Sequence, residues 1–134
     1  MIDIQVINVN PPCLDHVTNW FNSVVESENK TLGDLAIVFG SDEWLLSMNI
    51  EYLNHDYYTD IITFDYCTND IISGDLLISL DRVYENASAF NVSRETELNR
   101  VLVHGLLHLC GYGDKSAKEI EIMRKKEDYY LSLL

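Results

Sequence analysis

Basic residues are scarce in this sequence, and its cysteines show no paired spacing. The 134 residues include 9 lysines and arginines against 22 aspartates and glutamates, which gives a net charge of −13. A surface of this sign repels phosphate groups, so the composition argues against a general nucleic-acid binder. The 3 cysteines are an odd number, which argues against a disulfide framework and favours reduced thiols in the cytoplasm.

Long apolar runs and linker-like segments are also absent. No stretch approaches the roughly 20 consecutive apolar residues of a membrane-spanning helix, so no membrane partner is expected. The N-terminal residues lack the basic region of a secretion signal and alternate like a strand. An apolar fraction of 47% is ordinary for a folded protein. We therefore predict a single domain, residues 1–134.

Most of the few basic residues lie toward the C-terminus. Lysine and arginine commonly occupy the solvated faces of helices, which is the simpler explanation of this cluster. A local basic face that contacts nucleic acid is the alternative, and the sequence alone leaves both open. The residues concerned are Arg94, Arg100, Lys115, Lys118, Arg124, Lys125 and Lys126.

Apolar periodicity predicts four strands. Alternation over residues 2–9 indicates a half-buried strand, and the apolar run 34–39 indicates a central one. Segments 60–66 and 75–80 are two further strands. The Asn, Asp, Ser and Gly residues between these two predict that they pair as a hairpin.

Helix signals lie between and after these strands, where apolar residues recur at helical spacing and serines stand at suitable N-cap positions. The expected helices are residues 15–28, one beginning after Ser41, one from Ser93 to Gly111, and one from a Ser116–Glu119 capping box to Leu133. This order predicts an α+β domain with one mixed sheet of about four strands and helices packed on it.

Two histidines and an aspartate form the strongest chemical signal. His104 and His108 are four residues apart on a predicted helix, so both imidazoles lie on one face and can reach one ion. Gly111 permits a left-handed turn that brings Asp114 back toward them. Two imidazoles and a carboxylate suit zinc, and three protein ligands leave a fourth position open, as in catalytic sites. We therefore predict a zinc site on this central helix.

The motif has two other interpretations, histidines without a metal and a peptidase site. A histidine pair alone is weak evidence for a metal, but burying two imidazoles among leucines is costly unless something satisfies them. The spacing also resembles that of the metzincin peptidases. Gly105 stands where those enzymes carry their general-base glutamate, so a metal-dependent peptidase is a poor alternative.

The motif His104-Gly105-x-Leu107-His108-Leu109-x-Gly111-Tyr112 resembles the signature of the YbeY family of bacterial metal-dependent endoribonucleases. Further blocks resemble the family's pattern as well. They are Asn49-x-x-Tyr52-x-x-x-Asp56-x-x-Thr59-Asp60-Ile61-Ile62-Thr63-Phe64, Gly74-Asp75-Leu76-Leu77-Ile78-Ser79, and Met123 with Glu127. The resemblance runs from about Ile2 to the end of the chain.

The resemblance implies a zinc-dependent single-strand endoribonuclease that acts in rRNA maturation and ribosome quality control in the cytoplasm. Its partners would be ribosomal RNA and the small ribosomal subunit, with ribosome-associated proteins as further candidates. His104, His108 and Asp114 would bind the metal and, with Arg100 one turn earlier, form the catalytic group. The alternative is a non-catalytic ribosome-associated maturation factor in which the metal is structural.

The sequence departs from the family pattern at three positions. Asp114 replaces the third ligand histidine, and a carboxylate is an acceptable zinc ligand. Leu53 replaces an arginine near the catalytic cleft, which removes a natural contact for phosphate. Tyr58 replaces a proline.

Several nearby residues have two possible roles each. Asp60 and Asp75 could orient a ligating histidine or relay a proton, or only cap strand ends. Cys110 is expected to be a core residue and His55 an exposed loop residue. Four tyrosines, Tyr52, Tyr57, Tyr58 and Tyr66, could stack on RNA bases or simply pack.

Overall fold

The computed structural model describes residues 1–134 and contains one four-stranded sheet in the order β1-β2-β4-β3. β1 (Ile2–Val6) is parallel to β2 (Thr31–Gly40), which is parallel to β4 (Ile71–Ser79). β3 (Ile61–Asp65) is antiparallel to β4. The predicted α+β class, the mixed sheet and the hairpin are confirmed.

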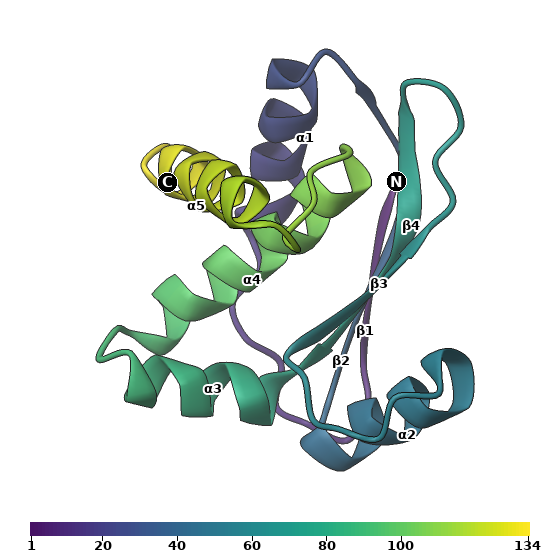
Figure 1. Ribbon diagram of the computed structural model, residues 1–134, viewed down its shortest axis with the longest axis vertical. Helices are drawn as coiled ribbons and strands as arrows, with labels where there is room; N and C mark the ends of the chain where they lie inside the picture. The colour runs from purple at the N-terminus through teal and green to yellow at the C-terminus, as the bar shows by residue number, and fades with distance from the viewer.

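Helices cover one face of this sheet and one end of the other (Figure 1). The first face carries α1 (Val17–Ser27), α3 (Leu80–Ala89), α4 (Arg94–Leu109) and α5 (Ala117–Leu131), whereas α2 (Asp42–Leu53) lies on the opposite side. The main core lies between the sheet and the first group, with α4 packed against β3 and β4. No helix combines the length and apolar character that a membrane crossing requires.

The predicted helix ends are largely confirmed. Ser41, Ser93 and Ser116 are N-caps, and each side-chain oxygen accepts a hydrogen bond from the backbone N–H three residues later. Glu119 completes the capping box with Ser116. Gly111 has a φ of 107°, the left-handed conformation expected of it.

The strand bounds differ more from the prediction. β1 ends at Val6 because Asn8 turns the chain with a φ of 52°. β2 and β4 begin earlier than expected, because Thr31 pairs with Ile71 and a register shift after Leu32 accommodates the polar residues there. The alternation in β1 does not reflect half-burial, since it is an edge strand with mostly exposed side chains.

Gly105 allows α4 to lie close to the sheet. A Cβ atom at this position would lie 2.7 Å from the Ile61 Cδ1 atom and 3.0 Å from the Leu76 Cδ2 atom. The glycine next to the first histidine therefore has a packing role, and it faces the core rather than the predicted ligands. A glutamate with the role it has in metzincins has no room here, which disfavours the peptidase interpretation.

Replacing Gly105 by valine is expected to lower the free energy of unfolding by about 1–3 kcal/mol, because its side chain must displace Ile61 and Leu76 in a packed core. Urea denaturation in the presence of a chelator measures this difference. Valine at the exposed Glu121 is the control and should change stability by no more than about 0.5 kcal/mol. Equal stability of the two variants would contradict the close packing.

Candidate metal centre

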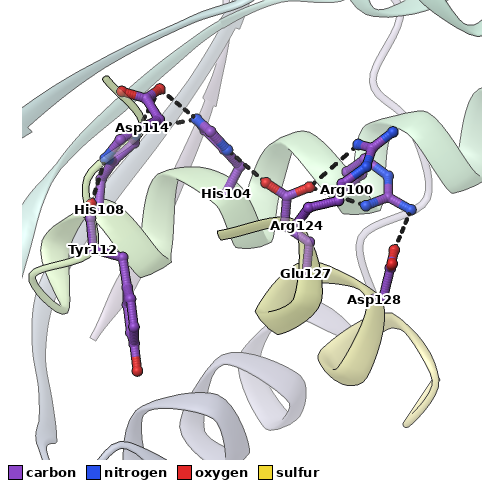
Figure 2. A network of polar contacts seen from close by, with 8 residues as sticks. All are labelled: Arg100, His104, His108, Tyr112, Asp114, Arg124, Glu127 and Asp128. Atoms are coloured by element: carbon purple, nitrogen blue, oxygen red, sulfur yellow. Dashed lines mark hydrogen bonds and ion pairs between the residues drawn. The ribbon is translucent and has the colours of Figure 1, made fainter. Parts of the chain in front are cut away.

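The three predicted ligands converge on one point (Figure 2). The Nε2 atoms of His104 and His108 are 3.0 Å apart, and the Asp114 Oδ2 atom lies 3.4 Å from the first and 3.2 Å from the second. Ligands at about 2.0–2.1 Å in a tetrahedral zinc site are separated by about 3.3 Å. The three atoms therefore already lie at the spacing of one face of such a tetrahedron.

Hydrogen bonds at the other ring nitrogens determine the tautomers of both histidines. The His108 Nδ1 atom is 2.8 Å from the Tyr112 carbonyl oxygen, and the His104 Nδ1 atom is 2.6 Å from the Glu127 Oε2 atom. A carbonyl and a carboxylate can only accept, so each Nδ1 donates. Both neutral rings thus turn an Nε2 lone pair toward the Asp114 carboxylate.

Three acceptors facing one another repel unless a cation or a proton lies between them. Two imidazole nitrogens and one carboxylate oxygen are a donor set that zinc accepts. The residues present therefore fit a divalent metal ion. About 25% of each histidine side chain and 42% of the Asp114 side chain is exposed, so the group is open to solvent on one side.

The turn after α4 carries Asp114 to the histidines. The left-handed Gly111 redirects the chain, and the Tyr112 N–H donates to the Leu107 carbonyl oxygen. The N-cap of α5, Ser116, lies two residues after Asp114, and its capping box with Glu119 fixes the far end of the same turn. The third ligand is consequently held between two helix ends.

A half-buried carboxylate next to this turn holds Tyr112 in place. Glu28, at the end of α1, accepts hydrogen bonds from Tyr112, Lys126 and Tyr130. Burial raises the pKa of Glu28, but the three hydrogen bonds and the Lys126 charge outweigh it, so the pKa is lowered and the group stays ionised. The carbonyl that orients His108 therefore depends on contacts with α1 and α5.

A second carboxylate holds His104. Glu127 on α5 is 4% exposed and also accepts from the Arg100 Nη1 atom at 2.9 Å. Burial disfavours both charged groups, yet their hydrogen bond and mutual attraction lower the pKa of Glu127 and raise that of His104. Sequence reasoning named Glu127 only as part of a family pattern. The available signal was its helical phase, which it shares with the buried Met123 and Tyr130.

Most of the clustered basic residues form ion pairs, so they do not build a free basic face. Arg100 forms ion pairs with Glu127 and Asp128, and Figure 2 shows both of them together with the Arg124–Glu127 pair. The lysines and arginines of α5 form three pairs in all. These pairs are Arg124 with Glu127, Lys125 with Glu121, and Lys126 with Glu28. The solvated-face explanation fits Arg124 and Lys125, whose side chains are 62% and 77% exposed, whereas Arg100 is 20% exposed and bound to the buried Glu127.

Asp60 and Asp75 could each orient a ligating histidine or relay a proton, but only Asp60 lies at the site. Asp60 lines the surface hollows beside His104, and burial raises the pKa of its carboxyl group. Asp75 lies on the opposite face of the sheet beside Tyr66, because strand alternation turns it away from α4. Of the two roles open to Asp75, orienting a ligating histidine is therefore excluded by its position. Cys110 packs against the core as expected, and burial raises the pKa of its thiol to about 12.

Comparison with known proteins decides the family. The family model described as Endoribonuclease YbeY matches residues 5–134. The chain belongs to the YbeY family. It is 52% identical over 116 residues to Endoribonuclease YbeY of Flavobacterium johnsoniae, covering 87% of this chain and 84% of that protein. It is 48% identical over 136 residues to Endoribonuclease YbeY of Phocaeicola vulgatus, covering 100% and 99%.

A solved structure agrees with this assignment. The solution structure of TM1509 from Thermotoga maritima aligns with a TM-score of 0.74 and 27% identity, covering 98% of this chain and 87% of that one. The fold and the family expected from the sequence are confirmed. Membership of the YbeY family also confirms the expected enzyme class, a nuclease that hydrolyses phosphodiester bonds.

Replacing Glu127 by glutamine is expected to weaken zinc binding by about 10- to 100-fold at pH 8, because a neutral amide supports the His104 ring less well. The raised pKa of His104 means that protons compete with the metal, so affinity in the original protein falls as pH decreases through that pKa. Glutamine removes the attraction that raises this pKa, so the fall begins at lower pH.

Zinc competition titrations between pH 5.5 and 8 measure both effects, with Glu121→Gln on the exposed side of α5 as the control. An unchanged affinity and pH profile in Glu127→Gln would contradict the role of Glu127.

Proposed function

We propose that this protein is a zinc-dependent endoribonuclease that cleaves single-stranded RNA during rRNA maturation in the cytoplasm, on or near the small ribosomal subunit. The observation that carries the proposal is the convergence of His104, His108 and Asp114 in a member of a family named for endoribonuclease activity. Zinc is proposed from the donor set and from the spacing of the three atoms.

The surroundings of the ligands suit a catalytic rather than a closed structural site. Two hollows of about 530 and 520 Å³ meet at the ligands, and His104, Asp114 and Asp60 line both of them. An RNA strand can therefore pass across the metal from one hollow into the other. When bound, zinc would supply a Lewis acid for the phosphodiester and a coordinated water of lowered pKa.

The chain's own residues supply orientation and proton transfer. Gly105 has no side chain that could act as general base, so a residue outside α4 supplies it. Asp60 is our candidate, since its carboxyl lines the hollows at the metal and burial raises its pKa toward the range useful for proton transfer. Glu127 and the Tyr112 carbonyl hold the two imidazoles in the ligating tautomer.

Arg100 acts through Glu127 in this proposal. Its Nη1 and Nη2 atoms donate to Glu127 and Asp128 at 2.9 and 2.8 Å, so the guanidinium is engaged with carboxylates. These contacts favour a positioning role over direct contact with substrate. The competing role, a cation beside the charge developing on phosphorus, is the one expected from the sequence.

Replacing His108 by alanine is expected to lower zinc-dependent cleavage of single-stranded RNA by more than about 100-fold while the fold persists. His16→Ala is the matched control, because His16 hydrogen-bonds Asn99 away from the ligands. Gel assays of RNA cleavage and circular dichroism of each variant measure the two properties.

The alternative of a structural metal predicts a different result. In that case the original protein would not cut RNA with any divalent metal, and His108→Ala would unfold. That pair of outcomes would overturn the proposed activity and favour a maturation factor without catalysis.

Replacing Arg100 by glutamine separates its two roles. If Arg100 positions Glu127, zinc affinity falls about 10-fold and saturating zinc restores most of the cleavage rate. Direct contact with phosphate predicts the opposite pattern, with unchanged zinc affinity and a lower kcat at saturating zinc. Cleavage kinetics over a range of zinc concentrations distinguish these outcomes.

A further inference from the structure

Two aromatic side chains, His55 and Tyr57, also line the hollow of about 520 Å³ at the proposed metal ligands. His55 and Tyr57 lie in the loop between α2 and β3, and their rings stack with centroids 5.2 Å apart and planes inclined by 20°. Both side chains are exposed, and 56% of Tyr57 is accessible to solvent. A flat aromatic surface therefore faces the same space as His104 and His108.

One buried residue fixes both halves of this pair. Asn49 on α2 is 1% exposed. Its side-chain amide donates to the Tyr57 backbone carbonyl oxygen at 3.0 Å, and its backbone carbonyl oxygen accepts from the His55 backbone N–H at 3.1 Å. Asn54 ends α2 in the left-handed conformation, with a φ of 56°. The Tyr57 hydroxyl and the His55 Nδ1 atom are 2.9 Å apart. The loop thus holds the rings in place without a ligand.

The other three tyrosines that could stack on RNA bases do not line this hollow. The Tyr58 hydroxyl donates to Glu43 at 2.5 Å, and Arg82 lies over its ring. Tyr52 and Tyr66 line a groove on the opposite face of the sheet. Tyr57 is the one tyrosine that lines the hollow at the ligands.

Carboxylates outnumber basic side chains in this hollow, so stacking of bases contributes more to RNA binding there than contacts with phosphate. Asp60, Asp65 and Asp114 line it, whereas Lys115 is the only lysine or arginine there. Contacts with phosphate are therefore few, and nearby carboxylates oppose them. The face of a nucleobase carries no net charge and is stabilised by stacking on an aromatic side chain whatever the charge around it.

We propose that His55 and Tyr57 form a stacking platform for an unpaired base next to the scissile phosphate. This inference rests on the proposed function and specifies its substrate as RNA with an unstacked base. A base within a duplex has its faces covered by its neighbours, so the platform excludes paired RNA. With one or two phosphate contacts, the slope of log affinity against log salt is about −0.7 to −1.4.

The experiment uses a single-stranded RNA that carries 2-aminopurine at successive positions and the zinc-loaded full chain, with the emission read before cleavage proceeds. Binding to the original protein is expected to quench the emission at one position, because stacking on an aromatic ring quenches this base. Tyr57→Ala abolishes that quenching and weakens binding about 10-fold, whereas Tyr57→Phe retains both. Tyr129→Ala is the matched control, since Tyr129 on α5 is 55% exposed and lines neither hollow.

The outcomes separate this inference from the proposed function. If Tyr57→Ala matches the original protein in quenching and affinity, the platform is wrong, and intact cleavage by the original protein leaves the nuclease proposal standing. If quenching depends on Tyr57 but no divalent metal gives cleavage, the platform stands and the nuclease proposal fails. Absence of RNA binding by the original protein overturns the platform. Unchanged thermal unfolding and zinc affinity of Tyr57→Ala verify that only the surface has changed.

Discussion

Two hydrogen bonds to the Nδ1 atoms of the proposed metal ligands His104 and His108 determine whether their Nε2 atoms can bind a metal. By accepting from the Nδ1 atoms of His104 and His108, Glu127 and the Tyr112 carbonyl leave both Nε2 lone pairs facing Asp114. A change of either tautomer would replace a ligand with a donor. The orientation of the rings therefore depends on α5 and on the turn after α4, and through Glu28 on α1.

The packing of α4 explains why the ligands remain accessible. Gly105 lets the helix lie close to β3 and β4, while the two histidines on either side of it point to the other face. Hollows consequently lie on both sides of the ligand group, one toward α3 and α5 and one toward the loop after α2. Asp60, before β3, borders both. A helix set further from the sheet would separate these residues.

Features that depend on spacing within a few residues could be predicted from the sequence. The three serine caps, the left-handed Gly111 and the shared face of the histidines follow from helix geometry alone. The bonds from Glu127 to His104 and from Glu28 to Tyr112 join residues 23 and 84 positions apart, so only the tertiary fold brings them together. The choice between the two roles of Asp75 could have been made from local spacing. Alternation along β4 places it opposite to its core-facing neighbours, and that alternation was visible in the sequence.

The charge of the chain limits how an enzyme of this kind can bind RNA. Several lysines and arginines are paired with carboxylates, so they add little attraction to a surface with a net charge of −13. Non-specific binding to phosphates is consequently weak. With the proposed divalent ion bound, two neutral imidazoles, one carboxylate and the ion would carry a net charge of about +1. Local attraction for phosphate would then be concentrated at the metal and at Lys115, and a strand would gain the rest of its binding from uncharged base faces. In the proposed function, such a site would favour short unpaired segments of rRNA rather than RNA in general.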